Sequence, residues 1–265
     1  MTRTGLTDSH CHLDHFSAEE MPEVLARTRE AGVDGLVTIG TRLSRAAQQK
    51  ALATLDAPEL RVWCTIGTHP DHVDEEALPT GAELAAMADD ARVVGIGESG
   101  LDYFHGQEDI RPRQQESFRV HIDAARRTGL PLVIHTREAD DDTLAILRDE
   151  TGKHGAFPFL IHCFSSGPDL ARGALELGGY ISFSGIATFN RAQAVRDVAK
   201  DVPAERLLVE TDSPYLAPVP KRGKRNEPGY VAYTARMLAE LRGMEDAAFA
   251  EMTTRNFSRL FTRAV

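Results

Sequence analysis

Short hydrophobic runs alternate with longer amphipathic stretches along the whole sequence. The runs are rich in Val, Ile, Leu and Phe, as expected for buried parallel strands. There are eight of them: Leu6–Cys11, Gly35–Ile39, Val62–Gly67, Val93–Glu98, Leu132–His135, Phe159–His162, Tyr180–Phe183 and Leu207–Glu210. The stretches between them repeat hydrophobic residues at helical spacing, for example over Ala18–Ala31, Arg111–Thr128, Asp169–Leu177 and Gln193–Lys200.

This alternation predicts βαβ units and a parallel sheet. Eight units in 265 residues fit a closed (β/α)8 TIM barrel, which needs roughly 250 residues. We therefore predict an α/β fold with a single barrel domain over residues 1–265. An open doubly wound sheet is the alternative. Two further helical patterns, Tyr230–Arg242 and Asp246–Arg263, follow a loop rich in Pro, Gly, Lys and Arg, and we expect them to cover the barrel exterior.

The composition is that of a globular protein with a sizeable core, 42% hydrophobic and 26% charged. No apolar run approaches the roughly 18 residues of a membrane span, and the N-terminus lacks a secretory signal pattern. We therefore expect a cytoplasmic protein without membrane contact. Cys11, Cys64 and Cys163 are too few and too widely spaced for a disulfide framework or a thiolate zinc site, so we expect three buried thiols.

The formal net charge of −10 counts against a surface generally adapted to polyanions. Non-specific affinity for nucleic acids comes largely from Lys and Arg that neutralise phosphates. A nucleic-acid substrate would therefore need a local basic patch beside the active site. The sequence shows no sign of a stable protein partner.

Residues that can bind a metal stand at the carboxyl ends of five of the eight predicted strands. Barrel enzymes have their active sites at this end, where side chains from different strands converge. The residues are His10 and His12 on the first strand, Glu98 on the fourth, His135 on the fifth, His162 on the sixth and Asp212 after the eighth. We predict that they form a metal centre at the barrel mouth.

The local sequence assigns a role to several of these residues. His10 and His12 are two positions apart, so an extended strand directs both imidazoles to one face. Glu98 ends an apolar strand, and a buried carboxylate must be paired or metal-bound, so we predict that it bridges two cations. Asp212 is expected to complete the site of His10 and His12 and to accept a proton from water. The alternatives are core histidines held by hydrogen bonds and an ion pair of Glu98 with an arginine.

His135 and His162 end neighbouring strands and supply two imidazoles for a second metal. Glu210 lies on the same face as Asp212 but deeper, so we expect it to be structural. Four imidazoles and two carboxylates suit a pair of transition-metal ions, since imidazole favours Zn, Mn, Fe or Ni over Mg and Ca. Two such divalent ions lower the pKa of bound water and stabilise charge on the attacking and leaving oxygens, which indicates hydrolysis.

Taken together, several motifs resemble the TatD family of metal-dependent deoxyribonucleases, a branch of the amidohydrolase-like hydrolases. They are DSHCHLD (8–14), GESGLDYF (97–104), VIHTRE (133–138), IHCFS (161–165), ETDSPYLAP (210–218) and RGKRNEP (222–228). The resemblance covers essentially the whole chain. It implies a deoxyribonuclease that depends on divalent cations, often a 3′→5′ exonuclease, with the six residues above as metal ligands. The family's assays commonly use Mg, so the two divalent metal ions stay open between Zn, Mn and Mg.

Other positions resemble the family's pattern only in part. GTHPDHV (67–73) matches the family's GxHP and places His69 at the end of the third strand, where we expect it to face substrate. Asp71 stands where a histidine is frequent, and Ser166 stands where glycine is usual. Neither change affects a predicted ligand, but both are expected to alter the fit of the substrate.

Cations and aromatic residues near the predicted mouth indicate how a phosphate ester would bind. Arg137, just past His135, is predicted to hold a phosphate oxygen through its planar fork. Arg222, Lys224 and Arg225 follow the eighth strand, where barrels often bind phosphate, although such a loop can also be merely solvated. Tyr103 and Phe104, near the same rim, are candidates for stacking a base.

The sequence therefore predicts phosphodiester hydrolysis of DNA ends, single strands or small nucleotides. We expect Glu98 and Asp212 to be the catalytic residues, with a hydroxide bridging the two metals. Amide, ester or lactone hydrolysis by the same site is the first alternative, because fold and metals do not determine the substrate. The second is a non-catalytic metal-binding or scaffold protein, which would not need open coordination positions.

Overall fold

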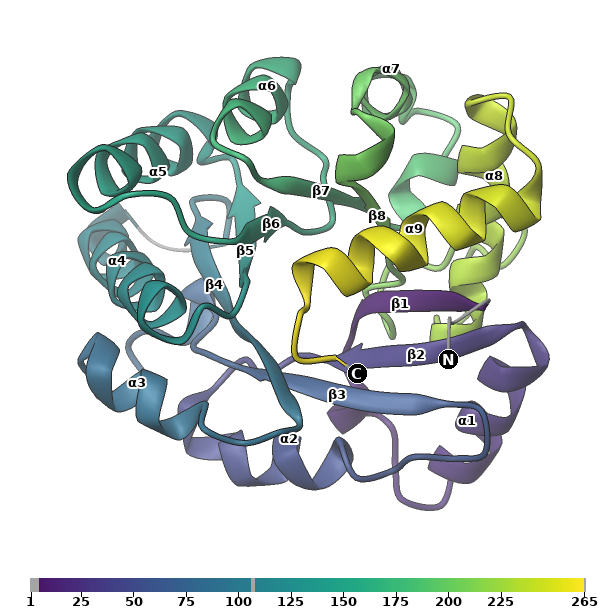
Figure 1. Ribbon diagram of the computed structural model, residues 1–265, viewed down its shortest axis with the longest axis horizontal. Helices are drawn as coiled ribbons and strands as arrows, with labels where there is room; N and C mark the ends of the chain where they lie inside the picture. Colours follow the sequence, from purple (N-terminus) through teal and green to yellow (C-terminus); the bar gives the residue numbers. More distant parts are fainter. Residues whose placement is uncertain (1–4, 106–107, 265) are drawn as a thin grey trace.

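The computed structural model describes residues 5–105 and 108–264, which form one barrel of eight parallel strands surrounded by helices (Figure 1). The strands are β1 (Leu6–Cys11), β2 (Val33–Thr38), β3 (Arg61–Ile66), β4 (Val93–Asp102), β5 (Leu132–Arg137), β6 (Phe159–Ile161), β7 (Tyr180–Phe183) and β8 (Leu207–Val209). Each begins at the predicted residue or up to two residues earlier.

Each strand pairs in parallel with the next, in the order β1 to β8. Backbone hydrogen bonds just beyond β8 close the ring: the His12 N–H donates to the Ser213 carbonyl (2.8 Å) and the Asp212 N–H donates to the His10 carbonyl (2.9 Å). The predicted TIM barrel is thus confirmed, and the chain does not form the open sheet. The closure also brings the residues after β8 next to the end of β1.

The helices follow the strands as the amphipathic pattern predicts. They are α1 (Met21–Glu30), α2 (Ala46–Leu52), α3 (Gly81–Met87), α4 (Arg111–Thr128), α5 (Asp140–His154), α6 (Pro168–Glu176), α7 (Gln193–Asp201), α8 (Val231–Leu241) and α9 (Asp246–Leu260). Helix α4 ends at Gly129, whose φ of 69° is left-handed and lets its N–H donate to the Ala125 carbonyl. Such a residue is a common helix end. Within the described residues, no helix is both long and apolar enough to cross a membrane.

We predicted that the C-terminal helices cover the barrel exterior, and the end of the last helix also reaches the barrel interior. The final turn of α9 and the residues after it bury Phe257, Leu260, Phe261 and Ala264 in an apolar cluster. The rest of that cluster comes from the barrel interior, largely from the first residues of the strands: Val37, Ile39, Trp63, Val94, Val133, Leu160, Tyr180 and Leu208. The chain end therefore closes the N-terminal opening of the barrel, because this opening would otherwise expose the apolar interior to water.

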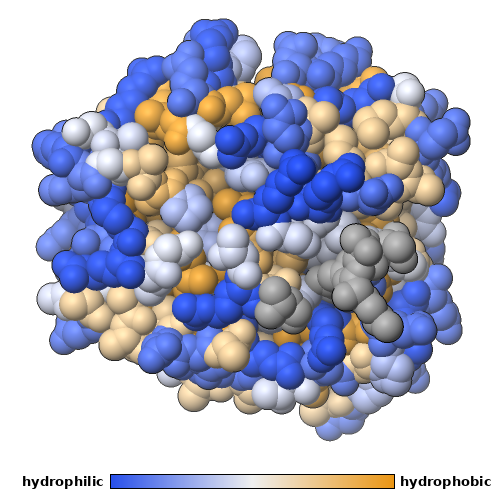
Figure 2. Space-filling model, viewed as in Figure 1, coloured by the Kyte–Doolittle hydropathy of each residue, from blue (hydrophilic) through white to orange (hydrophobic). Residues whose placement is uncertain are grey.

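Polar contacts hold this closure in place. The Arg263 guanidinium donates to the carbonyls of Ala88, Asp90 and Val93, on the loop that leads into β4. Figure 1 shows α9 lying across the ring of strands, and Figure 2 shows the same face with hydrophilic and apolar residues interspersed. The opposite opening, at the carboxyl ends of the strands, is left for the functional site.

All three cysteines are free thiols, as predicted. Cys11 and Cys64 are buried, but Cys163 is only partly buried, which corrects the expectation of three buried thiols. Cys163 lies beyond the end of β6, at the barrel mouth, where its Sγ is 3.1 Å from the Ser184 hydroxyl.

Candidate metal centre

Side chains from six strand ends converge at the carboxyl end of the barrel. They form three overlapping groups whose possible ligand atoms lie within 4.8 Å of one another. The groups are His10, His12 and Asp212; His10, Glu98 and His162; and His69, Glu98 and His135. All six ligands predicted from the sequence are therefore gathered in one place.

The first group joins the ends of β1 and β8. The Nε2 atoms of His10 and His12 are 3.2 Å apart, and the Asp212 Oδ1 is 3.3 Å from the His12 Nε2 and 3.6 Å from that of His10. Two imidazoles on one tetrahedral zinc, with Zn–N near 2.0–2.1 Å, would have their nitrogens about 3.3 Å apart. The three donors therefore fit a single transition-metal ion.

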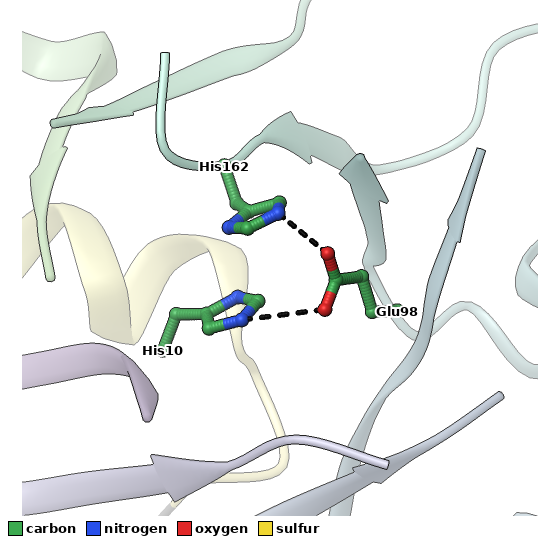
Figure 3. A group of neighbouring side chains, drawn as sticks. All are labelled: His10, Glu98 and His162. Atoms are coloured by element: carbon green, nitrogen blue, oxygen red, sulfur yellow. Dashed lines mark ion pairs between the residues drawn. The ribbon is translucent and has the colours of Figure 1, made fainter. Parts of the chain in front are cut away.

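Glu98 belongs to two of the three groups, and Figure 3 shows its carboxylate between His10 and His162. Its Oε1 is 2.7 Å from the His162 Nε2 and 2.9 Å from the His135 Nδ1, whereas its Oε2 is 3.4 Å from the His10 Nε2. Its two oxygens thus face different sets of imidazoles, as a carboxylate that bridges two cations would require.

The charge state of Glu98 suits that position. Burial by itself raises the pKa of Glu98, but the nearby His162, His69 and His10 outweigh it and hold the pKa well below its usual range. The carboxylate is therefore ionised although it is only 2% exposed. The predicted alternative of an ion pair with an arginine does not match these contacts, because all its ion-pair partners in the described part of the chain are histidines.

Two further carboxylates orient the histidines from behind. The His162 Nδ1 donates to the Glu210 Oε1 (3.2 Å), and the His135 Nε2 donates to the Asp102 Oδ2 (3.1 Å). Each bond leaves the other ring nitrogen pointing at Glu98. Metal-binding histidines are commonly fixed in this way. Glu210 therefore lies deeper than Asp212, as the sequence predicted, while Asp102 is a contact that the sequence analysis missed.

The imidazoles divide into two kinds by charge. Burial lowers the pKa of His10 and His69. Burial also acts on His135, but hydrogen bonds to Asp102 and Glu98 outweigh it and raise the pKa of His135 to about 9. For His162, the charges of Glu98 and Glu210 likewise outweigh burial and raise the pKa well above its usual value. Without metal, protons balance the central carboxylate; a metal ion would take their place.

Comparison with known proteins agrees with this geometry. Residues 7–262 match the family described as TatD related DNase. The chain belongs to this TatD family. It is 42% identical over 264 residues to the metal-dependent hydrolase YcfH of Escherichia coli K12, a match that covers 97% of this chain and 95% of YcfH. The protein is thus a metal-dependent hydrolase of the TatD family.

Two more relatives extend the comparison. The chain is 34% identical over 250 residues to the "3'-5' ssDNA/RNA exonuclease TatD" of Erwinia tasmaniensis, covering 92% of this chain and 94% of that one. Among solved structures, the TatD homologue YjjV of Escherichia coli K12 superimposes with a TM-score of 0.88 at 28% identity and 99% coverage of both chains. The fold and the family therefore agree along the whole chain.

His69 lies closer to the candidate metal centre than the sequence predicted. Its Nε2 is 3.5 Å from the Glu98 Oε1, and its ring centroid is 4.5 Å from that of His135. This places His69 among the candidate ligands, whereas we predicted only that it faces substrate. It lies three residues past the end of β3, so strand periodicity did not assign its direction.

The predicted phosphate-binding cations do not form one patch. The Arg225 guanidinium pairs with Glu20 (2.9 Å) and donates to the His15 carbonyl. Arg222 instead lies over the Phe189 ring, 3.8 Å from its centroid. Lys224 is exposed. Arg225 is therefore on the β1 side of the mouth and Arg222 on the β7 side, and both are already held by the protein.

Arg137 lies at the rim, beside a cavity of about 680 Å³ between the loops after β5 and β6. Its guanidinium is 5.0 Å above the Phe104 ring. The cavity also contains Ser166, whose hydroxyl donates to the Asp140 Oδ1 (2.7 Å). Carboxylates of Glu138 and Asp140–Asp142 line much of this cavity, so Arg137 supplies its positive charge.

Proposed function

We propose that this protein hydrolyses phosphodiester bonds in DNA, removing nucleotides from 3′ ends and preferring single strands. The observation that carries the proposal is the central carboxylate of Glu98, which faces imidazoles of both candidate metal positions. Support for the substrate comes from the relative named as a 3′-5′ ssDNA/RNA exonuclease, which is 34% identical. A cytoplasmic location stays a prediction from the sequence.

Two divalent metal ions fit the donors present. His10, His12 and Asp212 would hold one, His135 and His162 the other, and Glu98 would lie between them. His69 is placed to add to the second position. Such ions activate water and stabilise the negative charge that develops on phosphate oxygens. The candidate ions are Zn, Mn and Mg.

Asp212 is positioned to act as the base. Burial raises the pKa of Asp212, but the hydrogen bond from His12 and the charge of His10 outweigh it and hold the pKa below its usual value. The carboxylate is therefore ionised near neutral pH and can accept a proton from an attacking water. Its side chain is about 15% exposed, so it faces the mouth through which substrate and water enter.

Amide, ester or lactone hydrolysis is the alternative that the same residues allow. The charge of the substrate distinguishes the two functions, because a phosphodiester is anionic whereas amides, esters and lactones of this kind need not be. The mouth offers few cations that are not already paired. This shortage of cations favours a short or single-stranded phosphodiester over a long duplex, whose binding depends on many phosphate contacts.

The test is an activity screen of purified protein reconstituted with Zn, Mn or Mg. Substrates are single-stranded DNA, duplex DNA, RNA, a simple phosphodiester, and a panel of amides and lactones. We expect mononucleotides to be released from the 3′ end of single-stranded DNA only when metal is present. Turnover of an amide or lactone without cleavage of any phosphodiester would overturn the proposal while leaving the metal centre intact.

Asp212→Asn provides the inactive comparison. The backbone of Asp212 has a φ of 56°, a left-handed conformation that asparagine also adopts, so the fold should persist. Loss of a general base lowers kcat roughly 10²–10⁴-fold. The asparagine amide oxygen can still face the first metal position, so metal content, measured by mass spectrometry with metal in excess, should be retained. Asp142→Asn, an exposed rim carboxylate, is the matched control. Near-normal kcat in Asp212→Asn would contradict the role assigned to Asp212.

A further inference from the structure

Two exposed aromatic side chains flank the metal centre on opposite sides of the barrel mouth. Within the described residues, the large apolar side chains left exposed are Phe104 (55%), Tyr215 (50%) and Val219 (44%). Phe104 follows β4 and Tyr215 follows β8, and these strands are four apart in a ring of eight. The candidate ligands therefore lie between Phe104 and Tyr215.

Tyr215 is fixed beside the first metal position. Its ring centroid is 6.1 Å from that of His12 and 5.6 Å from that of His15. Its N–H donates to the Asp212 carbonyl (2.9 Å), and the Asn226 side-chain amide donates to the Tyr215 carbonyl (2.5 Å). The backbone is thus tied at two points next to candidate ligands, while half of the side-chain surface stays open to solvent.

Phe104 has an equivalent position beside the second candidate metal position. Its N–H donates to the Asp102 Oδ1 (2.9 Å), and the other oxygen of the same carboxylate accepts a hydrogen bond from His135. The Arg137 guanidinium lies over the Phe104 ring, and the His105 ring is 4.7 Å away, centroid to centroid. A single buried carboxylate therefore links this exposed ring to a candidate metal ligand.

Building on the phosphodiesterase function proposed above, we propose that Phe104 and Tyr215 each stack one of the two nucleosides that flank the scissile phosphate. A phosphate at the metal centre would direct its two nucleosides to opposite sides, where these rings lie. Stacking tolerates every base, because each base has a π face. The Arg137 guanidinium covers one face of the Phe104 ring, so the base would stack on the other face.

This arrangement selects unpaired strands. In a duplex each base is already stacked and paired, so placing two neighbouring bases on separate rings costs unstacking energy. A protein partner is a poorer explanation for the exposed rings. A protein-binding site that uses exposed apolar side chains is usually marked by one contiguous patch, whereas these two rings are separated by a polar cluster of histidines and carboxylates.

The experiment compares kcat/KM for a thymidine dinucleotide with three analogues that lack the 5′ base, the 3′ base or both. For Phe104→Ala and Tyr215→Ala, we expect a roughly tenfold loss on the complete dinucleotide, the size usual for one lost base stack. The loss in each variant should disappear on the analogue that lacks the base stacked on the substituted ring. If the analogue without the 5′ base abolishes the loss in one variant, the analogue without the 3′ base should abolish it in the other. Tyr215→Phe should recover the activity that Tyr215→Ala loses.

Val219→Ala is the matched control, because Val219 is similarly exposed but its N–H donates to Thr188, away from the ligands. A loss that persists on all analogues would show that the ring only shapes the metal centre, and would overturn the inference. An equal loss in Tyr215→Phe would also overturn it, since the hydroxyl would then be responsible.

If the metal-loaded wild-type protein cleaves no phosphodiester, the proposed function fails. If it cleaves the dinucleotide and the alanine variants match it, only the stacking inference fails.

Discussion

Asp102 links a candidate ligand to the loop that follows β4. Its carboxylate accepts hydrogen bonds from the His135 ring, the His105 ring (2.8 Å) and the N–H groups of Phe104 and His105. Its own N–H donates to the buried Gln114 side chain (3.0 Å). Burial raises its pKa, but the hydrogen bonds from His135 and His105 outweigh this and lower the pKa well below the usual value. The carboxylate therefore stays charged behind the metal centre.

Replacing Asp102 with asparagine should weaken metal binding without unfolding the chain. The amide keeps the shape but cannot hold the charged His135 ring in place, and losing such a contact typically costs 10–100-fold in metal affinity. Titration against a competing chelator measures the affinity, and thermal denaturation checks the fold. Asp142→Asn is the control, since the Asp142 carboxylate accepts from the Tyr103 hydroxyl (2.6 Å) rather than from a ligand. Unchanged affinity in Asp102→Asn would show that His135 does not depend on this bond.

Strand β4 carries the central ligand and crosses its neighbours unusually closely. A Cβ on Gly67 would lie 2.5 Å from the Gly97 Cα, and a Cβ on Gly100 would overlap the His135 carbonyl oxygen. Gly100 also has a φ of 146°, which L side chains rarely adopt. These glycines let the backbones of β3, β4 and β5 approach each other, so that Glu98 reaches the imidazole of His135.

Gly100→Ala should therefore damage both stability and metal binding. The added methyl must push β4 away from β5 and strain the backbone, which we expect to cost roughly 2–4 kcal/mol and to lower the Tm by roughly 5–15 °C. Gly152→Ala is the opposite case: it lies in α5 with nothing within 4 Å of an added Cβ. It should stabilise by roughly 0.4–1 kcal/mol. Calorimetry measures the Tm of both variants. An unchanged Tm in Gly100→Ala would mean that β4 and β5 separate easily.

At this scale the sequence was informative about where strands start and less so about where they end. The predicted ring of ligands followed from one rule, that barrel strands present their carboxyl ends together. The sequence analysis missed the contact of Asp102 because we ended the fourth strand at Glu98. In the structure, Ser99–Asp102 continue to pair with Ile134–Arg137 of β5 after a register shift. With the strand extended, its period of two would have placed Asp102 on the face of Glu98. The closure of the N-terminal opening by α9 was not predicted, because an amphipathic pattern does not indicate which surface a helix covers.

The protein must balance the negative charge of Glu98 and Asp212 in the candidate metal centre. In metal-free protein, the raised pKa values of His12, His135 and His162 mean that these rings carry protons beside Glu98 and Asp212. A histidine whose pKa is raised on folding adds stability that is fully present below its unfolded pKa of about 6.5. That stability is lost as the pH rises through the folded pKa, about 9 for His135.

The metal-free protein should therefore lose several degrees of Tm between pH 6.5 and pH 9, because deprotonated imidazoles leave the central carboxylates unbalanced. Bound divalent metal should remove most of this decline, since the cation then balances Glu98 and its affinity rises as the ligands deprotonate. Calorimetry with and without metal across this pH range makes the comparison. A flat profile for the metal-free protein would show that the imidazoles are already neutral at pH 6.5.

The closure of the barrel by Phe257, Leu260 and Phe261 also bears on the order in which the protein matures on the ribosome. All the candidate ligands, as far as Asp212, are translated before these three residues. A nascent chain can thus present every ligand while the opposite opening of its barrel is still unsealed. Because domains generally fold as units, we infer that a stable metal centre forms only after the α9 segment has emerged. On this inference, each new molecule binds metal late in its synthesis, and only once the barrel is complete.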